Sequence, residues 1–269
     1  MAGDDQRGND GRRPTKAERR EQARREREEI QRRMARRRRN RSIGLVLVAV
    51  SVVTVVVAVF LTTGGGSGSG IASGNDLLKQ APAATKAAGC DAVQSTPNYQ
   101  DAKGADPAID HAHIGSAEMP TAPELSTYPT TAPASGPHDQ TPLPAGIYAT
   151  TPDVYSSIHA LEHGGVIIWY APGTSNDQLT QLLEFYGQRP KDANVGQDRV
   201  IIAPYSVPGQ GTASELPSGV QMALVSWHRL QTCSSVNLAV AFDFTSQYEN
   251  PVWDGRTYKG VAREPGGAM

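Results

Sequence analysis

The chain has 269 residues, which is enough for one membrane segment followed by one domain of ordinary size. Its two cysteines exclude a Cys-rich zinc module, and an aromatic content of 6% argues against a polytopic membrane protein. The formal charge of −1 conceals a division, because residues 1–42 hold 16 basic and eight acidic side chains, whereas residues 43–269 hold 10 and 19. A chain divided in this way is not a simple cytosolic globule.

An apolar segment follows the basic region. Residues 43–62 predict a transmembrane helix, because the run is uncharged and long enough to cross a hydrocarbon core of about 30 Å. Arginines crowd the side before the run, and an uncharged Gly/Ser spacer follows it. The positive-inside rule therefore makes residues 1–42 a basic cytoplasmic segment and places the C-terminal domain outside the cell membrane. A cleaved signal peptide and a buried core helix are the alternatives.

The basic segment suggests two kinds of partner. Residues 15–39 intersperse Glu with Arg and show no apolar stripe, which predicts a charged helix without a core to join. Its position beside the membrane favours contact with anionic lipid headgroups, where each Lys or Arg contributes about 1 kcal/mol. Binding of nucleic acid by such an arm is the alternative, and the position favours it less.

The part of the chain beyond the membrane segment divides into three regions. Residues 63–89 are predicted as a flexible linker, in which the Ala-rich residues 75–88 allow a short helix that Pro82 interrupts. Residues 90–250 are predicted as the extracytoplasmic domain, and residues 251–269 as a tail.

The first half of the domain is predicted to be loops and turns, because Pro, Thr, Asp and Gly dominate residues 95–147. Cys90 and Cys233 both lie in the extracytoplasmic part, where an even pair of cysteines predicts one disulfide. The alternative is a thiol pair for metal or redox chemistry, but neither cysteine lies in a C-x-x-C motif.

Regular elements begin near residue 165. The predicted strands are 166–170, 199–203, 220–227 and 234–248, and the predicted helix runs from about residue 176 to 186. The last strand rests on period-two alternation, and its alanines leave a helix open. The expected class is α+β: a small ectodomain sheet with at least one packed helix, in a partly ferredoxin-like β-α-β-β-β order, below a loop-rich N-terminal layer.

The histidines predict a metal site. The candidate ligands are His113, His138, His159, Glu162 and His163. His159 and His163 are four residues apart, so on a helix both imidazoles share one face, whereas on a strand they would be roughly 13 Å apart. Imidazole ligands suit zinc or copper. The alternative is a structural polar network made by the same side chains, and His228 is expected to be structural or on the surface.

No catalytic motif stands out in the chain. HALEH at 159–163 matches the H-x-x-E-H letters of the inverted zinc peptidases, which keeps a metal-assisted hydrolase as an alternative. Those enzymes need a long helix, whereas Gly164 and Gly165 end this helix at once. The chain also lacks a G-x-S-x-G elbow, a P-loop and a dinucleotide fingerprint, so we expect no catalytic residues and favour a non-enzymatic role.

Several phrases resemble one known family. SGPH at 135–138 and HALEHGGV at 159–166 are similar to motifs of an uncharacterised family of single-pass membrane-anchored proteins, frequent in actinobacteria and known by a domain of unknown function. The resemblance covers roughly residues 90–250 and implies the anchor, the ectodomain and the polar cluster. Ala160 and His228 depart from the family pattern, where Ser and Gly are usual. The resemblance implies no activity.

Three functions are consistent with these observations. The first is an envelope scaffold or partner-binding module, in which the histidines hold loops onto the sheet. The second is a His-rich ectodomain that binds zinc or copper, and the third is a metal-assisted hydrolase. The sequence favours the scaffold as the physiological role, while metal binding is the prediction that is tested most sharply.

Overall fold

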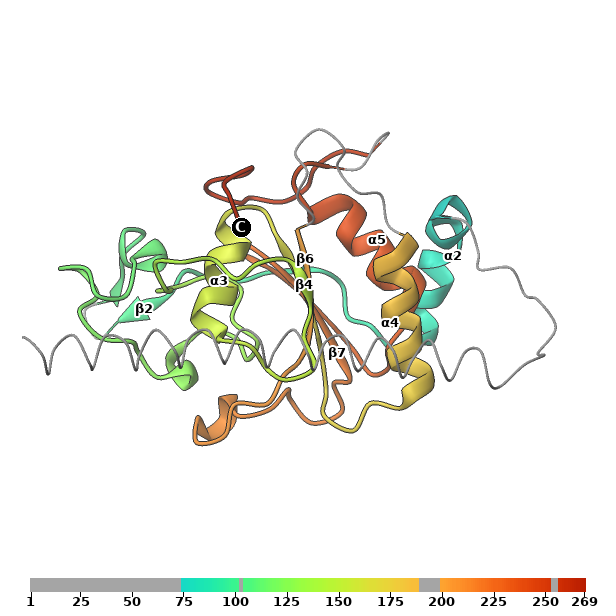
Figure 1. Cartoon of the computed structure of the whole chain (residues 1–269), viewed down its shortest axis with the longest axis horizontal. Coiled ribbons are helices and arrows are strands. Elements are labelled where there is room, and N and C mark those ends of the chain that lie inside the picture. The colour runs from blue at the N-terminus through green and yellow to red at the C-terminus, as the bar shows by residue number, and fades with distance from the viewer. Residues whose placement is uncertain (1–73, 102–103, 189–198, 253–255) are drawn as a thin grey trace, which may run out of the picture. The chain divides into compact units, whose positions relative to one another are not determined.

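The computed structural model describes residues 74–101, 104–188, 199–252 and 256–269 (Figure 1). The predicted cytoplasmic segment 1–42, the predicted membrane helix 43–62 and the first part of the predicted linker lie outside these ranges. None of the helices within the ranges combines the length and the apolar composition that crossing a bilayer requires. Residues Gly68–Met269 belong to one compact unit.

A six-stranded mixed sheet has the strand order β1-β8-β7-β5-β6-β4. The strands are β1 (Gln94–Ser95), β4 (Gly146–Ile147), β5 (Val166–Tyr170), β6 (Val200–Pro204), β7 (Met222–Ser226) and β8 (Arg229–Cys233). β6 runs parallel to β4 and β5, whereas the pairs β5–β7, β7–β8 and β1–β8 are antiparallel. A separate ribbon pairs β2 (Gln100–Asp101) with β3 (Gly104–Ala105). The α+β class is confirmed, and three of the four predicted strands coincide with β5, β6 and β7.

Helices and loops cover the two faces of the sheet differently (Figure 1). The helices are α2 (Gly74–Ala87), α3 (Val154–Glu162), α4 (Asn176–Gln188) and α5 (Leu238–Tyr248), and 3₁₀ turns occupy η1 (Ile109–His111), η2 (Leu125–Thr127) and η3 (Gly211–Ala213). On the helical face, α2, α4 and α5 pack against the sheet. On the loop face, α3 and the loop layer (residues 99–101 and 104–138) pack against it. The predicted helix from residue 176 is confirmed as α4.

The central strands are apolar along their whole length because both faces are covered. In β5, Val166 and Ile168 face the core with the three helices, while Ile167 and Trp169 face the core with α3 and the loops. All four side chains are buried. A strand that is covered on both sides loses the polar alternation of a half-exposed strand, so the sequence shows a continuous apolar run.

The prediction of a strand over residues 234–248 is wrong. This segment contains helix α5, and the strand that pairs with β7 is β8, which the sequence analysis missed. Asn237 caps α5, since its Oδ1 accepts hydrogen bonds from Ala239 N at 2.9 Å and Val240 N at 3.3 Å. Eight of the helix's side chains are buried, so no single apolar stripe marks the helical period.

The prediction of a partly ferredoxin-like order is also corrected, because the strands of the sheet are arranged differently. The β-α-β-β-β order holds when β8 replaces the wrongly placed strand, but α5 follows it. In addition, β5 and β6 pair directly and in parallel across five residues. A ferredoxin-like sheet has a split β-α-β unit, with another strand between the two, and that strand is absent between β5 and β6.

A disulfide and a helix attach the start of the domain to the helical face. Cys90 and Cys233 are bonded, with their sulfurs 2.09 Å apart, as the pairing of the two cysteines predicts. Helix α2 lies within the segment predicted as a linker and contains Pro82. Its Leu77 and Ala81 are buried, and α2 packs against α5. The disulfide follows α2 directly and joins this region to the end of β8.

Candidate metal centre

The SGPH phrase forms a tight loop against Tyr128. Gly136 has a φ of +122°, and a Cβ there would lie 2.5 Å from Cε1 of Tyr128, so only glycine fits. The Tyr128 hydroxyl donates a hydrogen bond to the carbonyl of Pro137. Burial raises the pKa of Tyr128 well above its usual value, which keeps this donor protonated. The contacts fix the loop and hold the His138 ring in the interior, where it is fully buried.

A short backbone pairing places His113 beside His138. The two residues form a parallel bridge, in which Ile114 N donates to the His138 carbonyl at 2.8 Å and His138 N donates to the Ala112 carbonyl at 3.1 Å. The two ring centroids are 5.0 Å apart. His113 is exposed, so this side of the pair faces solvent.

Helix α3 supplies the facing side chains. Asp153 caps the helix by accepting a hydrogen bond from a first-turn amide at 2.7 Å. Gly164, at a φ of +90°, and Gly165 then end it with the backbone hydrogen bonds of a Schellman motif. Of the two conformations considered for HALEH, the structure has the helix, and His159 and Glu162, three residues apart, lie on the side of α3 that faces the loop layer.

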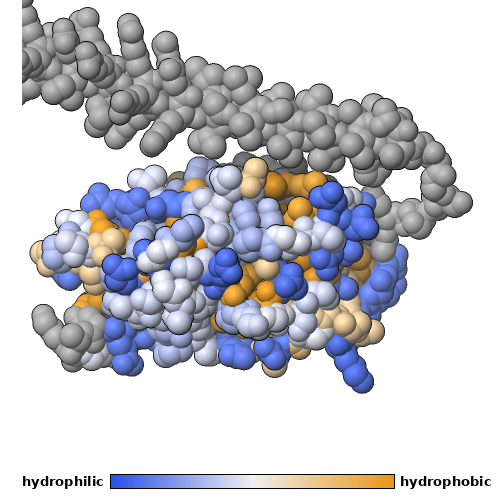
Figure 2. Space-filling view, turned by 90° about the horizontal axis from the view of Figure 1, so that it is seen from below, coloured by the Kyte–Doolittle hydropathy of each residue, from blue (hydrophilic) through white to orange (hydrophobic). Residues whose placement is uncertain are grey.

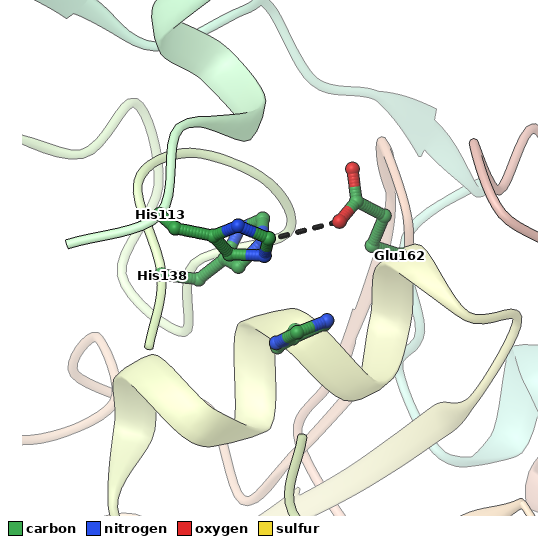
Figure 3. A group of neighbouring side chains, drawn as sticks. His113, His138 and Glu162 are labelled. Carbon is green, nitrogen blue, oxygen red and sulfur yellow. Dashed lines mark ion pairs between the residues drawn. The ribbon is translucent and has the colours of Figure 1, made fainter. Parts of the chain in front are cut away.

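Four side chains converge between the loop layer and α3. They are His113, His138, His159 and Glu162, and one ligand atom from each lies within 4.8 Å of the others. Figure 3 shows His113 and His138 pointing from the loops toward the carboxylate at the end of α3. The His159 ring lies 4.7 Å from the His138 ring and 4.9 Å from the His113 ring, measured between centroids. Of the five predicted ligands, the structure thus brings four into one group.

The hydrogen bonds of three imidazoles leave their Nε2 atoms directed into the cluster, where His159 Nε2 faces His163 Nε2 and His138 Nε2 faces Glu162. Nδ1 lies near a backbone carbonyl in each ring: Gly136 O at 2.9 Å for His138, Asp139 O at 2.7 Å for His159 and Ala268 O at 2.6 Å for His163. A carbonyl only accepts, so each Nδ1 carries the proton, and each neutral ring has a lone pair on Nε2. Metal-bound histidines in proteins show this same pattern of carbonyl partners.

The contact between His138 and Glu162 needs a positive charge between its two atoms. His138 Nε2 lies 3.1 Å from Glu162 Oε2, and both groups are almost fully buried. His138 Nε2 is nevertheless a buried polar atom without a hydrogen bond. Because the ring's proton is on Nδ1, two lone pairs face each other. Either a second proton on His138 or a metal ion resolves this contact.

His163, the fifth predicted ligand, lies at the edge of the group. Its Nε2 is 3.1 Å from His159 Nε2, so the predicted pairing across one helical turn is present. The same nitrogen is 3.4 Å from Glu264 Oε2, on the exposed C-terminal segment. His163 therefore contacts the group through His159 and lies outside the set of four whose ligand atoms are all mutually close.

The electrostatic environment favours the forms of these residues that bind metals. Burial, together with the neighbouring His138, lowers the pKa of His159 to about 4, although the hydrogen bond to the Asp139 carbonyl opposes this shift. For Glu162, burial raises the pKa, but the close approach of the His138 imidazole at 3.1 Å outweighs burial, so the net pKa is lowered. Near neutral pH the His159 imidazole is therefore neutral and Glu162 is ionised.

The C-terminal segment closes over the end of α3, which the sequence analysis did not foresee. Glu264 N donates to the Glu162 carbonyl at 2.9 Å, and Gly266 N donates to the His163 carbonyl at 3.1 Å. The buried Arg199 holds both parts together, since its Nη1 donates to the carbonyls of His163 and Gly267. These contacts join residues 36 to 103 positions apart, and no local pattern in the sequence signals them.

The fold and the site define an α+β domain with a group of three histidines and one glutamate, of which only His113 is exposed. The profile of DUF3105, a family of proteins of unknown function, matches residues 121–259, which is more than half of the chain. The chain belongs to this family. The match contains His138, His159 and Glu162, whereas His113 precedes it. Searches of curated proteins and of solved structures returned no significant match.

Proposed function

We propose that the domain binds one divalent transition-metal ion, zinc or copper, through His113, His138, His159 and Glu162. The observation that supports this proposal most strongly is the contact of two buried atoms with lone pairs. His138 Nε2 faces Glu162 Oε2 at 3.1 Å without a hydrogen bond. A divalent cation attracts both atoms at once. Three nitrogen ligands and one oxygen ligand form a donor set that zinc and copper accept.

The spacing of the atoms supports the same conclusion. Zinc ligands lie about 2.0–2.2 Å from the ion, so two ligands of a tetrahedral site are roughly 3.3 Å apart. The 3.1 Å between His138 Nε2 and Glu162 Oε2 is close to that value. All four ligand atoms lie within 4.8 Å of one another. Small rotations of the side chains would bring them to the spacing of a tetrahedral site.

The exposed position of His113 gives the site a route from solvent. His138, His159 and Glu162 are buried, whereas His113 stands at the surface of the loop layer. With all four residues bound, the ion would link the loops to α3 as a closed structural site. If His113 swings away, three protein ligands remain and one position opens, which is the arrangement that a metal-assisted hydrolase requires.

The competing explanation is a polar network in which extra protons take the place of the ion. A second proton on His138 would bridge to Glu162, and another would have to lie between His159 and His163. Protonated rings are unfavourable here, because burial, and after it the neighbouring His138, lowers the pKa of His159. One divalent ion resolves the contact between His138 Nε2 and Glu162 Oε2 without a second proton on His138.

The place of the domain in the cell is part of the proposal. The apolar run 43–62 supports a single-pass anchor, and the Cys90–Cys233 disulfide supports an extracytoplasmic position, since disulfides persist in oxidising compartments. Partner binding has less support. On the face that Figure 2 shows, hydrophobic residues lie among polar ones, and in the described residues only Ile147 and Val261 are large, apolar and exposed.

Elemental analysis of the full-length chain tests the proposal. The chain is purified in mild detergent without chelator, dialysed against micromolar zinc or copper and then freed of excess ion. We expect one ion per chain, lost in a His159→Asn/Glu162→Gln double variant and kept in His111→Asn, which removes an imidazole outside the group. Absence of bound zinc and copper, or equal loss in both variants, contradicts the proposal. Circular dichroism of each variant verifies that the fold is retained.

A further inference from the structure

A pocket of about 260 Å³ lies next to the candidate metal centre. Its polar and aromatic lining consists of Asn98, Asp110, His111, Trp227, His228 and Arg263. Pockets for drug-sized ligands measure roughly 300–1,000 Å³, so this one suits a smaller molecule. The four residues of the metal group are not part of its lining, so the pocket needs an explanation of its own.

The one carboxylate of the pocket has its oxygens occupied. Asp110 is buried, and its Oδ1 accepts hydrogen bonds from Tyr99 N at 2.5 Å and from Ser135 Oγ at 3.0 Å. Its Oδ2 lies 2.9 Å from His228 Nε2. The serine contacts the carboxylate and not the imidazole, so these three residues lack the order of a nucleophile activated by a base. Asp110 therefore offers little further attraction for a cation or a donor.

His228 is fixed by the same network. Its Nε2 faces Asp110, and its Nδ1 lies 3.1 Å from the Thr96 carbonyl. A carboxylate only accepts, so Nε2 carries a proton and donates it to Asp110. Nδ1 also lies 3.5 Å from the Thr96 hydroxyl, so both nitrogens of the ring have partners. The residue adopts a φ of +54°, a conformation that non-glycine residues keep only when their surroundings hold them there.

The other polar side chains of the pocket have donors to spare. Throughout the described parts of the chain, no hydrogen bond engages the side chain of Asn98 or His111. Arg263 has only an ion pair, with its Nε 4.0 Å from Glu162 Oε1. Its side chain is 53% exposed, so the guanidinium is within reach of a ligand from solvent. The side-chain donors of Asn98 and His111 therefore suit a hydrogen-bond acceptor, and the half-exposed guanidinium of Arg263 suits an anion.

The pocket borders the metal centre on two sides. Glu162 has one oxygen near His138 and the other near Arg263, so a single carboxylate separates the two sites. Trp227 also lines the pocket, and its ring lies edge-on to the His138 ring at 6.0 Å. A molecule held by Arg263 would therefore lie beside the ion.

From these contacts we infer that the pocket binds a small oxyanion, a carboxylate or a phosphate group, through Arg263, His111 and Asn98. Arginine offers a planar fork of donors that matches both groups. The inference deepens the proposed metal-binding function, because the anion would be oriented next to the ion. Only the position of the anion beside a metal ion depends on the metal-binding function. The donors of the pocket do not depend on it.

Isothermal titration calorimetry tests this inference on the full-length chain in mild detergent. Inorganic phosphate is titrated in one experiment and acetate in another, at low ionic strength, to distinguish the two sources of oxyanion. Arg263→Gln removes the proposed donor. Arg256→Gln is the matched control, because Arg256 pairs with Asp243 at 2.7 Å outside the pocket. Metal content is measured on every sample.

We expect saturable binding of at least one anion at one per chain, weakened at least about tenfold by Arg263→Gln and kept in Arg256→Gln, since charged hydrogen bonds are the strong ones. Absence of saturable binding with both anions overturns the inference, and so does equal weakening in the two arginine variants. If the chain holds no metal but binds an anion through Arg263, the pocket stands and the metal proposal fails. If it holds metal but binds neither anion, only the pocket fails.

Discussion

The two faces of the sheet are stabilised by different means. On the helical face, α2, α4 and α5 bury aliphatic and aromatic side chains such as Phe185 and Phe242, and the Cys90–Cys233 disulfide lies on this side. On the loop face, α3 and irregular segments bury Asp110, His138 and Glu162 as well as apolar groups. The first face depends on the burial of apolar area, whereas the second depends on polar contacts at a few fixed positions.

This difference indicates where function resides in the domain. Burying a polar group costs free energy unless it is paired, so a protein that keeps several of them on one face has a reason to do so. The helical face would fold equally well with other apolar residues of similar size. The loop face requires particular donors at particular distances, and the metal centre and the pocket both lie there.

The largest expected effect comes from the helical face. Phe185 and Phe242 pack edge to face, with centroids 5.9 Å apart, and both are buried. Phe242→Ala should lower the free energy of unfolding by about 3–5 kcal/mol, because it removes buried apolar surface and leaves a cavity. Urea unfolding measures the loss. The affinity for zinc should stay the same, and a parallel loss of affinity would show that the two faces are not independent.

Loss of the disulfide should rank next. A Cys90→Ser/Cys233→Ser variant should lose about 2–4 kcal/mol, since the bond closes a loop with a sequence separation of 143. Thermal unfolding of the variant beside the oxidised wild type measures this, with the reduced wild type as the control. A variant as stable as the oxidised wild type would show that the disulfide does not stabilise the domain.

Metal binding should strengthen the loop face. Zinc at 100 times its dissociation constant should raise the free energy of unfolding by about 2.7 kcal/mol, because only the folded state holds the site. Unfolding with zinc and with chelator measures the difference, which should vanish in His159→Asn/Glu162→Gln. A zinc effect that persists in this variant would place the ion elsewhere.

Gly136 offers a smaller change on the same face. Gly136→Ala adds a methyl group 2.5 Å from Tyr128 and forces alanine into a φ of +122°. We expect a loss of about 1–3 kcal/mol and weaker zinc binding, because the His138 ring follows directly. Gly173→Ala is the matched control, since Gly173 also has a positive φ, of +85°, but nothing lies within 4 Å of an added Cβ. Equal zinc affinity in both variants would contradict the role of the loop.

The metal-free domain should lose stability in acid. Burial and His138 lower the pKa of His159 from 6.5 to about 4, so the unfolded chain binds this proton more readily. The contribution of neutral His159 to the free energy of unfolding is complete above about pH 6.5 and is lost as the pH falls to about 4. This contribution is on the order of 1–3 kcal/mol. Urea unfolding across this range measures it. His159→Asn should show a shallower decline, and an unchanged slope would contradict the assignment.

Local features of the site could be predicted from the sequence. The spacing of His159 and His163, with the two glycines after them, predicts a short helix that ends at once, and the structure has this helix as α3. The positions of strands β5, β6 and β7 followed from their apolar runs. These features depend on neighbours within a few residues, which a single sequence displays.

Features that depend on distant contacts were missed or mistaken. Helix α5 was taken for a strand because it is buried on most sides and shows no stripe. Arg263 and Glu264 were assigned to a tail, since nothing near them in the sequence indicates that they meet Glu162 and His163. Asp110 and His228 are likewise 118 positions apart, and their pairing arises only when the β7–β8 turn packs against the loop layer.

X-ray absorption spectroscopy of the zinc-loaded full-length chain tests the metal centre most directly. The spectrum counts the light ligands around zinc, and the distant ring atoms of each imidazole give a separate signal. We predict four nitrogen or oxygen ligands at about 2.0–2.1 Å, three of them imidazoles. The imidazole count should fall to two in His138→Gln. A shell of water or carboxylate oxygens without imidazole scattering would contradict the account.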